Sequence, residues 1–408
     1  MHILFLTDNF PPEVNAPASR TYEHCLEWIR SGHQVTVVTC FPNFPTGKVY
    51  PGFRNRPWRW EEMDGIRVLR VWSYITANQG FIKRTLDYLS YMFSASLAAP
   101  WVRKPDVVVG TSPQFFTVCA AWLVSRLRRV PFVFELRDLW PESIKAVGAM
   151  KDSLPIRFLE KLELFLYRQA SAVVSVTNSF KKILIERGID GGKIHVVTNG
   201  LDPGRFRPMD KDRELLEKHH LAGRFVAGYI GTHGLAHSLE TLLEAAGELA
   251  SDPDGRDVTF LFLGDGANKA NLVARAAEIG LQNVIFLDSV PKNEVVRYWS
   301  LLDVSVIHLK KTDLFRTVIP SKIFESMGME LPILLGVQGE SADIVRSTGA
   351  GEVFEPENAG ELARRILALK QDRERFQDMK RHCAEAAKQY DRAALAQKML
   401  AIIESQLN

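Results

Sequence analysis

Residues 225–238, FVAGYIGTHGLAHS, lie just past the middle of the 408-residue chain and decide its fold. The first six residues form a mostly apolar run, which is typical of a strand buried on both faces. A glycine-rich loop follows, and a helical pattern begins at about Ser238. Four later apolar runs are each followed by a helical segment or a loop leading to one: residues 258–264, 284–287, 304–307 and 332–335. Strands that alternate with helices predict a doubly wound parallel sheet.

The first half of the chain follows the same order. A helical pattern from about Ser19 to Arg30 separates its first two apolar runs, and Gly32 stands where a C-terminal cap is expected. The strands expected in this half are residues 3–6, 33–39, 106–110, 131–135, 172–177 and 193–198. Residues 199–204, NGLDPG, are typical of a turn-forming linker between domains.

The sequence therefore predicts an α/β protein with two doubly wound parallel-sheet domains, residues 1–200 and 201–385. A charged helical segment at residues 386–408 follows them. Two such domains are expected to face a cleft at the carboxyl ends of both sheets. Open α/β sheets bind their ligands at that edge, so the cleft is the expected active site.

Composition excludes several classes of protein. Hydrophobic residues make up 46% of the chain and charged residues 24%, which is typical of a globular protein. No run of about 18 apolar residues is present, so no transmembrane helix is expected. The N-terminus lacks the basic segment and cleavage site of a signal peptide. Four cysteines stand far apart without metal-binding spacing, which favours reduced thiols in the cytoplasm and no metal site.

Charge is unevenly distributed along the chain. Residues 1–205 carry a net charge of +8 and the remainder −5. Basic residues mix with aromatic ones in residues 48–60, and basic pairs at 83–84 and 103–104 flank an apolar stretch. This mixture favours the interface of a membrane containing anionic lipids, although a solvated face with ordinary core aromatics is the alternative. Nucleic acid is not an expected partner, because no recognition motif accompanies the charge.

Three segments of the second half could bind an anion or a sugar. The glycines around Gly231 would let backbone N–H groups approach an anion, and His233 could add a donor; a tight turn is the alternative. Lys269 follows a strand and a glycine turn, where it could contact phosphate or simply face solvent. Ser321 and Lys322 precede an apolar helix that contains Glu325, and a buried carboxylate needs a partner such as a ribose diol, a lysine or a capping N–H.

Two segments of the first half could act on a hydroxyl group. Residues 135–143, ELRDLWPES, include Arg137, Asp138 and Glu142 at the carboxyl end of an expected strand. Carboxylates there could act as a general base or orient a hydroxyl, and an ion-paired turn is the alternative. Residues 10–20 are rich in small side chains that would let a substrate approach the backbone.

These motifs resemble family 4 of the retaining, nucleotide-sugar-dependent glycosyltransferases, whose GT-B fold has two facing Rossmann-like domains. Residues 197–202, with Phe206 and Pro208, resemble the family's linker signature. Residues 324–327 and 331–333 resemble its donor-site helix and the next strand. The chain is also similar to a bacterial L-fucosamine-transferase-like subgroup that makes O-antigen and capsule. This closer similarity rests on residues 10–13, 41–48, 137–143 and 320–322.

The resemblance implies a role for each candidate residue. In the C-terminal domain it implies diphosphate contacts from Gly231, Thr232, His233, Lys269, Ser321 and Lys322, a ribose contact from Glu325 and a base contact near Val290. In the N-terminal domain it implies acceptor binding by Asn15, Arg20, Lys48, Arg84 and Arg137, with Asp138 or Glu142 near the reacting hydroxyl. The final helix would cross back onto the N-terminal domain.

Three positions depart from the family pattern. Thr317 stands where many relatives have a glutamate, Thr232 and His237 where many have arginine and lysine, and residues 110–113 where many have a histidine. Lys269 and Lys322 would then supply the positive charge. In retaining chemistry the leaving phosphate can itself help deprotonate the acceptor, so no protein base is strictly required.

The implied reaction moves an N-acetylated hexosamine or 6-deoxyhexosamine from a nucleotide-diphosphate donor, expected to be UDP-linked, without a cofactor or a metal. The acceptor would be a saccharide on undecaprenyl diphosphate at the inner face of the cell membrane. Two alternatives remain: a nucleotide-sugar 2-epimerase on the same fold, and a non-catalytic nucleotide-sugar-binding scaffold. A nicotinamide oxidoreductase is disfavoured because no G-x-G-x-x-G follows the first strand.

Overall fold

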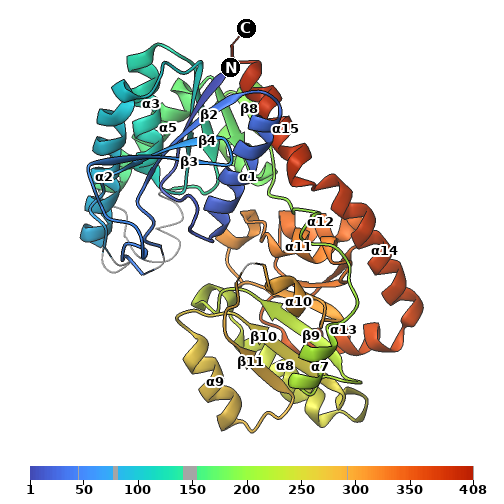
Figure 1. The fold of residues 1–408 in the computed structure, drawn as a ribbon. Helices are drawn as coiled ribbons and strands as arrows, with labels where there is room; N and C mark the ends of the chain where they lie inside the picture. The colour runs from blue at the N-terminus through green and yellow to red at the C-terminus, as the bar shows by residue number, and fades with distance from the viewer. Residues whose placement is uncertain (45, 77–80, 141–153, 292, 408) are drawn as a thin grey trace. The chain divides into compact units, whose positions relative to one another are not determined.

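The computed structural model contains two compact α/β units (Figure 1). It describes residues 1–44, 46–76, 81–140, 154–291 and 293–407. Unit 1 comprises Met1–Thr198 together with Arg392–Asn408, and unit 2 comprises Asn199–Asp391. The second passage between the units therefore falls in the turn after a helix, whereas the expected limit at residue 385 lies inside that helix. No helix within the described ranges is both long enough and apolar enough to cross a membrane.

Unit 1 is built on an eight-stranded sheet in the order β3-β4-β2-β1-β5-β6-β7-β8. Its strands are β1 His2–Leu6, β2 Gln34–Cys40, β3 Trp58–Met63, β4 Ile66–Val71, β5 Val107–Thr111, β6 Phe132–Leu136, β7 Ala172–Ser175 and β8 Ile194–Val196. Every neighbouring pair is parallel except β3 and β4. The central strands are fully buried, as their apolar runs predicted.

The antiparallel β3–β4 hairpin corrects the expectation of a wholly parallel sheet. Its turn is Asp64-Gly65, and both residues have positive φ, 51° and 82°. That backbone matches the right-handed twist of two antiparallel strands, and Asp-Gly is a preferred sequence for it. Residues 58–60 were expected to form a basic aromatic surface segment, and they are exposed as expected, but they belong to this edge strand.

Helices cover both faces of the sheet of unit 1. The helices are α1 Ala16–Arg30, α2 Phe81–Ala98, α3 Phe115–Arg128, α5 Leu154–Gln169, α6 Asn178–Glu186 and α15 Arg392–Glu404. Buried side chains of α1 and α15 pack on one face, and those of α2, α3, α5 and α6 pack on the other. Figure 1 shows α15, in red, beside α1, in blue. Between them, the indole N–H of Trp28 donates to the Ala396 carbonyl at 2.9 Å.

Unit 2 has a six-stranded, entirely parallel sheet in the order β11-β10-β9-β12-β13-β14. Its strands are β9 Phe225–Ile230, β10 Val258–Leu263, β11 Val284–Leu287, β12 Val304–His308, β13 Ile333–Gly336 and β14 Gly351–Val353. Its helices are α7 Arg213–Lys218, α8 Glu240–Ser251, α9 Lys269–Glu278, α10 Val295–Trp299, α11 Lys322–Gly328, α12 Glu340–Thr348, α13 Ala359–Gln371 and α14 Arg373–Gln389. Buried residues of α8, α9 and α13 pack on one face, those of α7, α10, α11 and α12 pack on the other, and α14 contributes buried residues to both. The two doubly wound parallel-sheet units predicted from the sequence are thus confirmed.

Gly228, in the central strand β9 of unit 2, lets the Leu302 side chain pack closely against the strand. A Cβ built on Gly228 of β9 would lie 2.1 Å from a methyl carbon of Leu302. Both residues are buried, so neither can move into solvent. The absence of a side chain at Gly228 therefore leaves the space that Leu302 fills against β9.

We expect Gly228→Ala to destabilise unit 2 by about 1–3 kcal/mol, because the added methyl overpacks the core against Leu302. The matched control is Gly247→Ala in α8, where the new Cβ would lie at an ordinary 3.6 Å from Leu281. That substitution should be neutral or stabilise the helix by up to about 1 kcal/mol. Urea-dependent hydrogen exchange of peptides from residues 199–391 measures both effects. Equal stability changes in the two variants would contradict the packing argument.

Candidate active site

The loops after β9 and β10 pack backbone against backbone at the carboxyl edge of the sheet of unit 2. Gly231 has φ +141° and Gly264 has φ +148°, and the Gly231 N–H donates to the Leu263 carbonyl at 2.8 Å. A Cβ on Gly264 would lie 1.9 Å from the Gly231 oxygen, and one on Gly266 would lie 2.5 Å from the His233 oxygen. Only glycine fits these contacts. The two loops therefore meet backbone to backbone, and together they form a glycine surface at this edge of the sheet.

The Lys322 amine lies next to this glycine surface. Its Nζ is 3.9 Å from the centroid of the Tyr229 ring, and a Cβ on Gly231 would lie 2.5 Å from Nζ. The missing side chain at Gly231 thus makes room for the end of Lys322. The tyrosine ring offers the cation a favourable face, and α11 begins at Lys322 itself.

Burial lowers the pKa of Lys322 to about 7, although the charge of Glu325 acts in the opposite direction. Desolvation disfavours the ammonium form more than the Glu325 carboxylate favours it. Near neutral pH the group therefore exchanges readily between amine and ammonium. An anion brought close to Nζ would raise the pKa and hold the proton, which makes Lys322 responsive to ligand charge.

The histidines of the Gly231 loop are neutral at pH 7. His233 is fully buried, and neither of its ring nitrogens has a hydrogen-bond partner. Burial, with Lys269 and Lys322 nearby, lowers the pKa of His233 to about 4. Burial and Lys322 do the same for His237, whose pKa is also about 4. The loop can therefore offer imidazole donors, but the positive charge comes from lysine.

The Lys269 ammonium donates hydrogen bonds to acceptors at the ends of β10 and β11. Its Nζ donates to the Gly264 carbonyl at 2.9 Å, to the Leu287 carbonyl at 3.0 Å and to an Asp288 carboxylate oxygen at 2.5 Å. These three bonds match the three N–H donors of an ammonium group. Lys269 thereby fastens the loop after β10 to the loop after β11. A ligand phosphate would have to displace one of these acceptors, and Asp288 is the exposed one.

The remaining candidates of unit 2 lie around the same edge. Ser321 lies just before α11 and Glu325 lies on its first turn, and both are partly buried. Glu325 is close enough to Lys322 to influence its pKa. Val290 lies in the loop after β11, packed against the hydrophobic core. Thr232 is exposed, and its carbonyl accepts the Tyr229 hydroxyl at 2.8 Å.

In unit 1, Ser112 organises the carboxyl ends of β5 and β6. Its hydroxyl oxygen accepts the backbone N–H of Arg137 at 2.8 Å and that of Asp138 at 3.2 Å. The Arg137 guanidinium donates to the Pro17 carbonyl at 3.2 Å, and burial lowers its pKa to about 10. Asp138 is half-buried at this edge. Glu142, the other predicted catalytic carboxylate, lies outside the described residues.

Two of the predicted acceptor contacts, Arg20 and Asn15, have partners within unit 1. Arg20 is buried and forms an ion pair with the buried Glu135 at 2.9 Å. It also donates to the carbonyls of Thr198 at 2.7 Å and Val197 at 3.0 Å. Asn15 caps α1, where its side chain accepts the Ala18 N–H at 2.8 Å. Each side chain therefore holds an element of unit 1 in place, and its contact with an acceptor stays a prediction.

Lys48 and Arg84 are exposed, as expected of groups that meet a ligand. The Arg84 Nε donates to the Tyr88 hydroxyl at 2.7 Å, and its guanidinium lies over the same ring. Both belong to the first unit, in the loop after β2 and in α2 respectively.

The sequence interpretation missed two carboxyl groups and one aromatic ring. Asp8 follows β1, and burial raises its pKa. Asp87 lies in α2, where burial and the nearby Asp8 raise its pKa to about 7. A polar residue directly after the first strand could have marked Asp8. Nothing local marks Asp87, or Tyr229 as the ring beneath Lys322. Within the described ranges, no three His, Cys, Asp or Glu side chains are grouped as a metal site.

We expect Lys322 to titrate near pH 7, charged below that pH and neutral above it. NMR of protein labelled at lysine Cε with carbon-13 measures this directly. The resonance should be missing in Lys322→Arg, while the other lysine resonances stay unchanged. A spectrum in which every lysine titrates near the ordinary value of about 10.4 would contradict the burial of this amine.

Comparisons with known proteins agree with this architecture. Residues 15–200 match the family described as "Glycosyl transferase 4-like domain", and residues 211–390 match "Glycosyl transferases group 1". The chain is 26% identical to the putative colanic acid biosynthesis glycosyl transferase WcaI of Escherichia coli K12, over 79% of this chain and 80% of that protein. It is 25% identical to the probable glycosyltransferase WbjE of Pseudomonas aeruginosa, over 68% and 69%.

Solved structures share the fold at low sequence identity. Sucrose-phosphate synthase from Thermosynechococcus elongatus superposes with a TM-score of 0.76 at 14% identity, covering 99% of this chain and 98% of that one. Anabaena HepE in complex with UDP superposes with a TM-score of 0.71 at 17% identity, covering 99% and 100%. Since the two family matches together span nearly the whole of both units, the chain is a glycosyltransferase of the GT-B fold, with a glycosyl transferase 4-like domain followed by a group 1 domain.

Proposed function

We propose that this glycosyltransferase is a retaining enzyme of bacterial surface polysaccharide synthesis. It transfers an N-acetylated hexosamine or 6-deoxyhexosamine from a nucleotide-diphosphate donor, UDP-linked, to a lipid-linked saccharide. The observation that carries the donor half is the Lys322 amine, which lies against the glycine surface of the β9 and β10 loops. Relatives named for colanic acid and teichuronic acid synthesis support the polysaccharide class, and the UDP complex of HepE supports the donor class.

The chemistry follows from the charge that builds up during the reaction. Breaking the bond between a sugar and a diphosphate leaves negative charge on the departing oxygen, so a cation placed there binds the transition state more tightly than the ground state. Lys322 has a pKa of about 7, and its proton is held more firmly as that negative charge develops. Glu325, one turn along α11, is the proposed partner of the ribose hydroxyls, and Val290 lies near the proposed base site.

The proposed acceptor site is the carboxyl edge of the sheet of unit 1. Ser112 orients the backbone of Arg137 and Asp138 there, and Asp138 is the candidate that would orient the acceptor hydroxyl. Asp87, with a pKa of about 7, is a second carboxyl that can exchange a proton near neutral pH. In a retaining reaction the leaving phosphate can itself accept the acceptor proton, so Asp138 need only position the hydroxyl. Lys48, Arg84 and Arg137 are the proposed contacts to an anionic acceptor such as undecaprenyl diphosphate.

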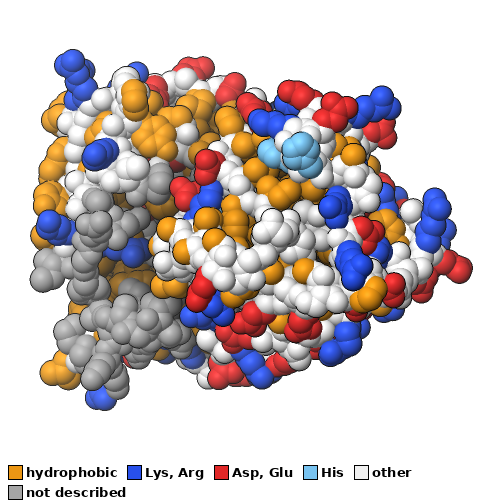
Figure 2. All heavy atoms as spheres, turned by 90° about the horizontal axis from the view of Figure 1, so that it is seen from below, with side chains coloured by type: hydrophobic (Ala, Val, Ile, Leu, Met, Phe, Trp, Pro, Cys, Tyr) orange, Lys and Arg blue, Asp and Glu red, His pale blue; other side chains and the backbone are white. Residues whose placement is uncertain are grey.

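A membrane-bound acceptor is supported by the outer helices of unit 1. Exposed apolar side chains recur along one face of each of three helices: Leu86, Phe93 and Leu97 in α2, Leu123 and Leu127 in α3, and Leu154, Phe158 and Phe165 in α5. Basic residues flank them, including Lys83 and Arg84 in the first turn of α2 and Arg126 and Arg128 in the last turn of α3. Figure 2 shows hydrophobic and basic side chains mixed along its left margin. Such faces suit the inner surface of a cell membrane with anionic lipids.

We expect Lys322→Met to weaken UDP binding by about 10- to 100-fold, because a charge-assisted contact to the diphosphate is lost. Wild-type affinity should also fall as the pH rises above 7, by up to about tenfold per pH unit, because binding then requires uptake of a proton by Lys322. The variant should lose this slope. Isothermal titration calorimetry measures both, and Lys218→Met, an exposed lysine of the same unit, is the control. Unchanged affinity in Lys322→Met would remove Lys322 from the donor site.

Incubating the enzyme with a UDP-sugar, with and without a lipid-linked acceptor, tests the proposed reaction. A transferase consumes the donor and elongates the acceptor only when both are present. Conversion of the donor alone would show a 2-epimerase. Binding of the donor without turnover of any acceptor would show a scaffold.

We expect Phe93→Ser combined with Leu97→Ser to reduce binding to vesicles containing phosphatidylglycerol by about tenfold or more, because two apolar side chains exposed at 61% and 70% no longer insert. Val273→Ser with Ile279→Ser, an exposed apolar pair of unit 2, should leave binding unchanged. Co-sedimentation with vesicles measures the bound fraction. Equal binding by the two double variants would contradict a docking role for α2.

A further inference from the structure

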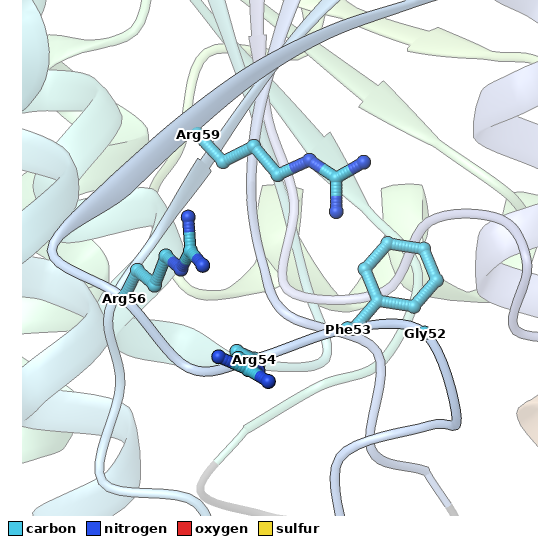
Figure 3. A pocket seen from close by; sticks show the side chains of 5 residues that line it. All are labelled: Gly52, Phe53, Arg54, Arg56 and Arg59. Atoms are coloured by element: carbon cyan, nitrogen blue, oxygen red, sulfur yellow. The ribbon is translucent and has the colours of Figure 1, made fainter.

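Three arginines line one pocket at the edge of unit 1. The pocket has a volume of about 390 Å³ and is lined by Gly52, Phe53, Arg54, Arg56 and Arg59 (Figure 3). Its residues come from the loop before β3 and from β3 itself. None of them belongs to the donor or acceptor groups discussed above. The volume falls in the range of about 300–1,000 Å³ that is typical of small-molecule sites.

Phe53 gives the pocket a fixed wall. The Arg59 guanidinium lies 5.4 Å from the centroid of the Phe53 ring, and the Arg70 guanidinium lies 5.1 Å from it. Arg70 is fully buried, forms an ion pair with Glu61 at 2.5 Å and donates to the Cys40 carbonyl at 3.1 Å. Its charge is thus neutralised inside the unit. Arg70 thereby holds the Phe53 ring, and this ring keeps in place the loop that carries Arg54 and Arg56.

The other arginines carry charge that the protein does not neutralise. Within the described ranges, neither Arg54 nor Arg56 has a carboxylate within ion-pair distance, and both are exposed. Arg59 reaches Glu61 at 3.7 Å, and Glu61 is already paired with Arg70. Guanidinium groups collected around one cavity repel each other, and an anion placed between them would relieve that repulsion.

We propose that this pocket binds a phosphate-bearing anion, a phosphate monoester or a diphosphate. Guanidinium groups present two parallel N–H donors that match phosphate oxygens, and several arginines around one cavity can share a doubly charged group. The inference goes beyond the proposed reaction, because it concerns a second anion site, in a different unit from Lys322. It holds whichever sugar is transferred.

The phosphate can belong to a soluble molecule or to a lipid. Trp58 of β3 stacks on Trp101 after α2, with ring centroids 5.1 Å apart, and both rings are exposed. The pocket loop is therefore continuous with the apolar end of α2. The chemistry recognised is the same in both cases, so the experiment distinguishes the source.

Arginine modification by phenylglyoxal, read out by peptide mass spectrometry, tests the proposal in the full-length protein. Saturating inorganic pyrophosphate should slow modification of Arg54 and Arg56 by about tenfold, because their N–H groups are then occupied. Vesicles containing phosphatidic acid form the second arm, and vesicles of phosphatidylcholine alone are the blank. Arg207 and Arg213, exposed arginines of unit 2, serve as internal controls in every sample.

Protection of Arg54 and Arg56 by pyrophosphate supports the proposal with a soluble phosphate as ligand. Protection by phosphatidic acid vesicles alone supports it with a lipid phosphate as ligand. Protection in neither arm, or protection that is equal at Arg207 and Arg213, overturns it. Arg54→Gln with Arg56→Gln should abolish the protection of Arg59 without altering UDP affinity. A change in UDP affinity in this variant would show that Arg54 and Arg56 contribute to donor binding, and would overturn a separate anion site.

Discussion

The candidate donor site depends on a lysine ammonium that lies on a tyrosine ring in the space left by a glycine. Tyr229 lies in β9, Gly231 in the loop after it, and Lys322 at the start of α11, about 90 residues later. The site therefore exists only once the sheet of unit 2 has formed. The tyrosine ring offers the ammonium a favourable face, whereas burial lowers the pKa of Lys322 to about 7. That lowered pKa makes the site sensitive to an incoming anion.

The fold was predictable because each central strand is a continuous apolar run with its own turn signals. The β3–β4 hairpin was missed because β3 is an exposed edge strand, where Trp58, Arg59 and Trp60 show no alternation of buried and exposed residues. Its clearest signal was the Asp64-Gly65 turn. A local sequence pattern predicts that a strand exists. The position of an edge strand in the sheet, however, depends on pairing with a single neighbouring strand.

The site was only partly predictable for a related reason. Gly231, Lys322 and Glu325 lie in local motifs, and the structure brings them to one sheet edge. The burial of Arg20 depends on Glu135, which lies 115 residues away in the sequence, and the pKa of Asp87 depends on Asp8. Arg20 and Arg70 are buried and paired, whereas Arg54 and Arg56 are exposed and form no ion pair with any carboxylate that the structure describes. No short window of sequence distinguishes an arginine that stabilises a core from one whose guanidinium is exposed and able to bind a ligand.

The position of α15 has a consequence for how the protein is made. Met399 and Ile403 are fully buried in the core of unit 1, together with Trp28 and Ile3. On the ribosome, the nascent first unit must wait for nearly 200 residues of unit 2 before these side chains emerge. Its apolar groove against α1 stays open throughout that interval, so early folding leaves a surface on which chaperones could act. The helix that completes the first unit is thus translated only after the whole of unit 2.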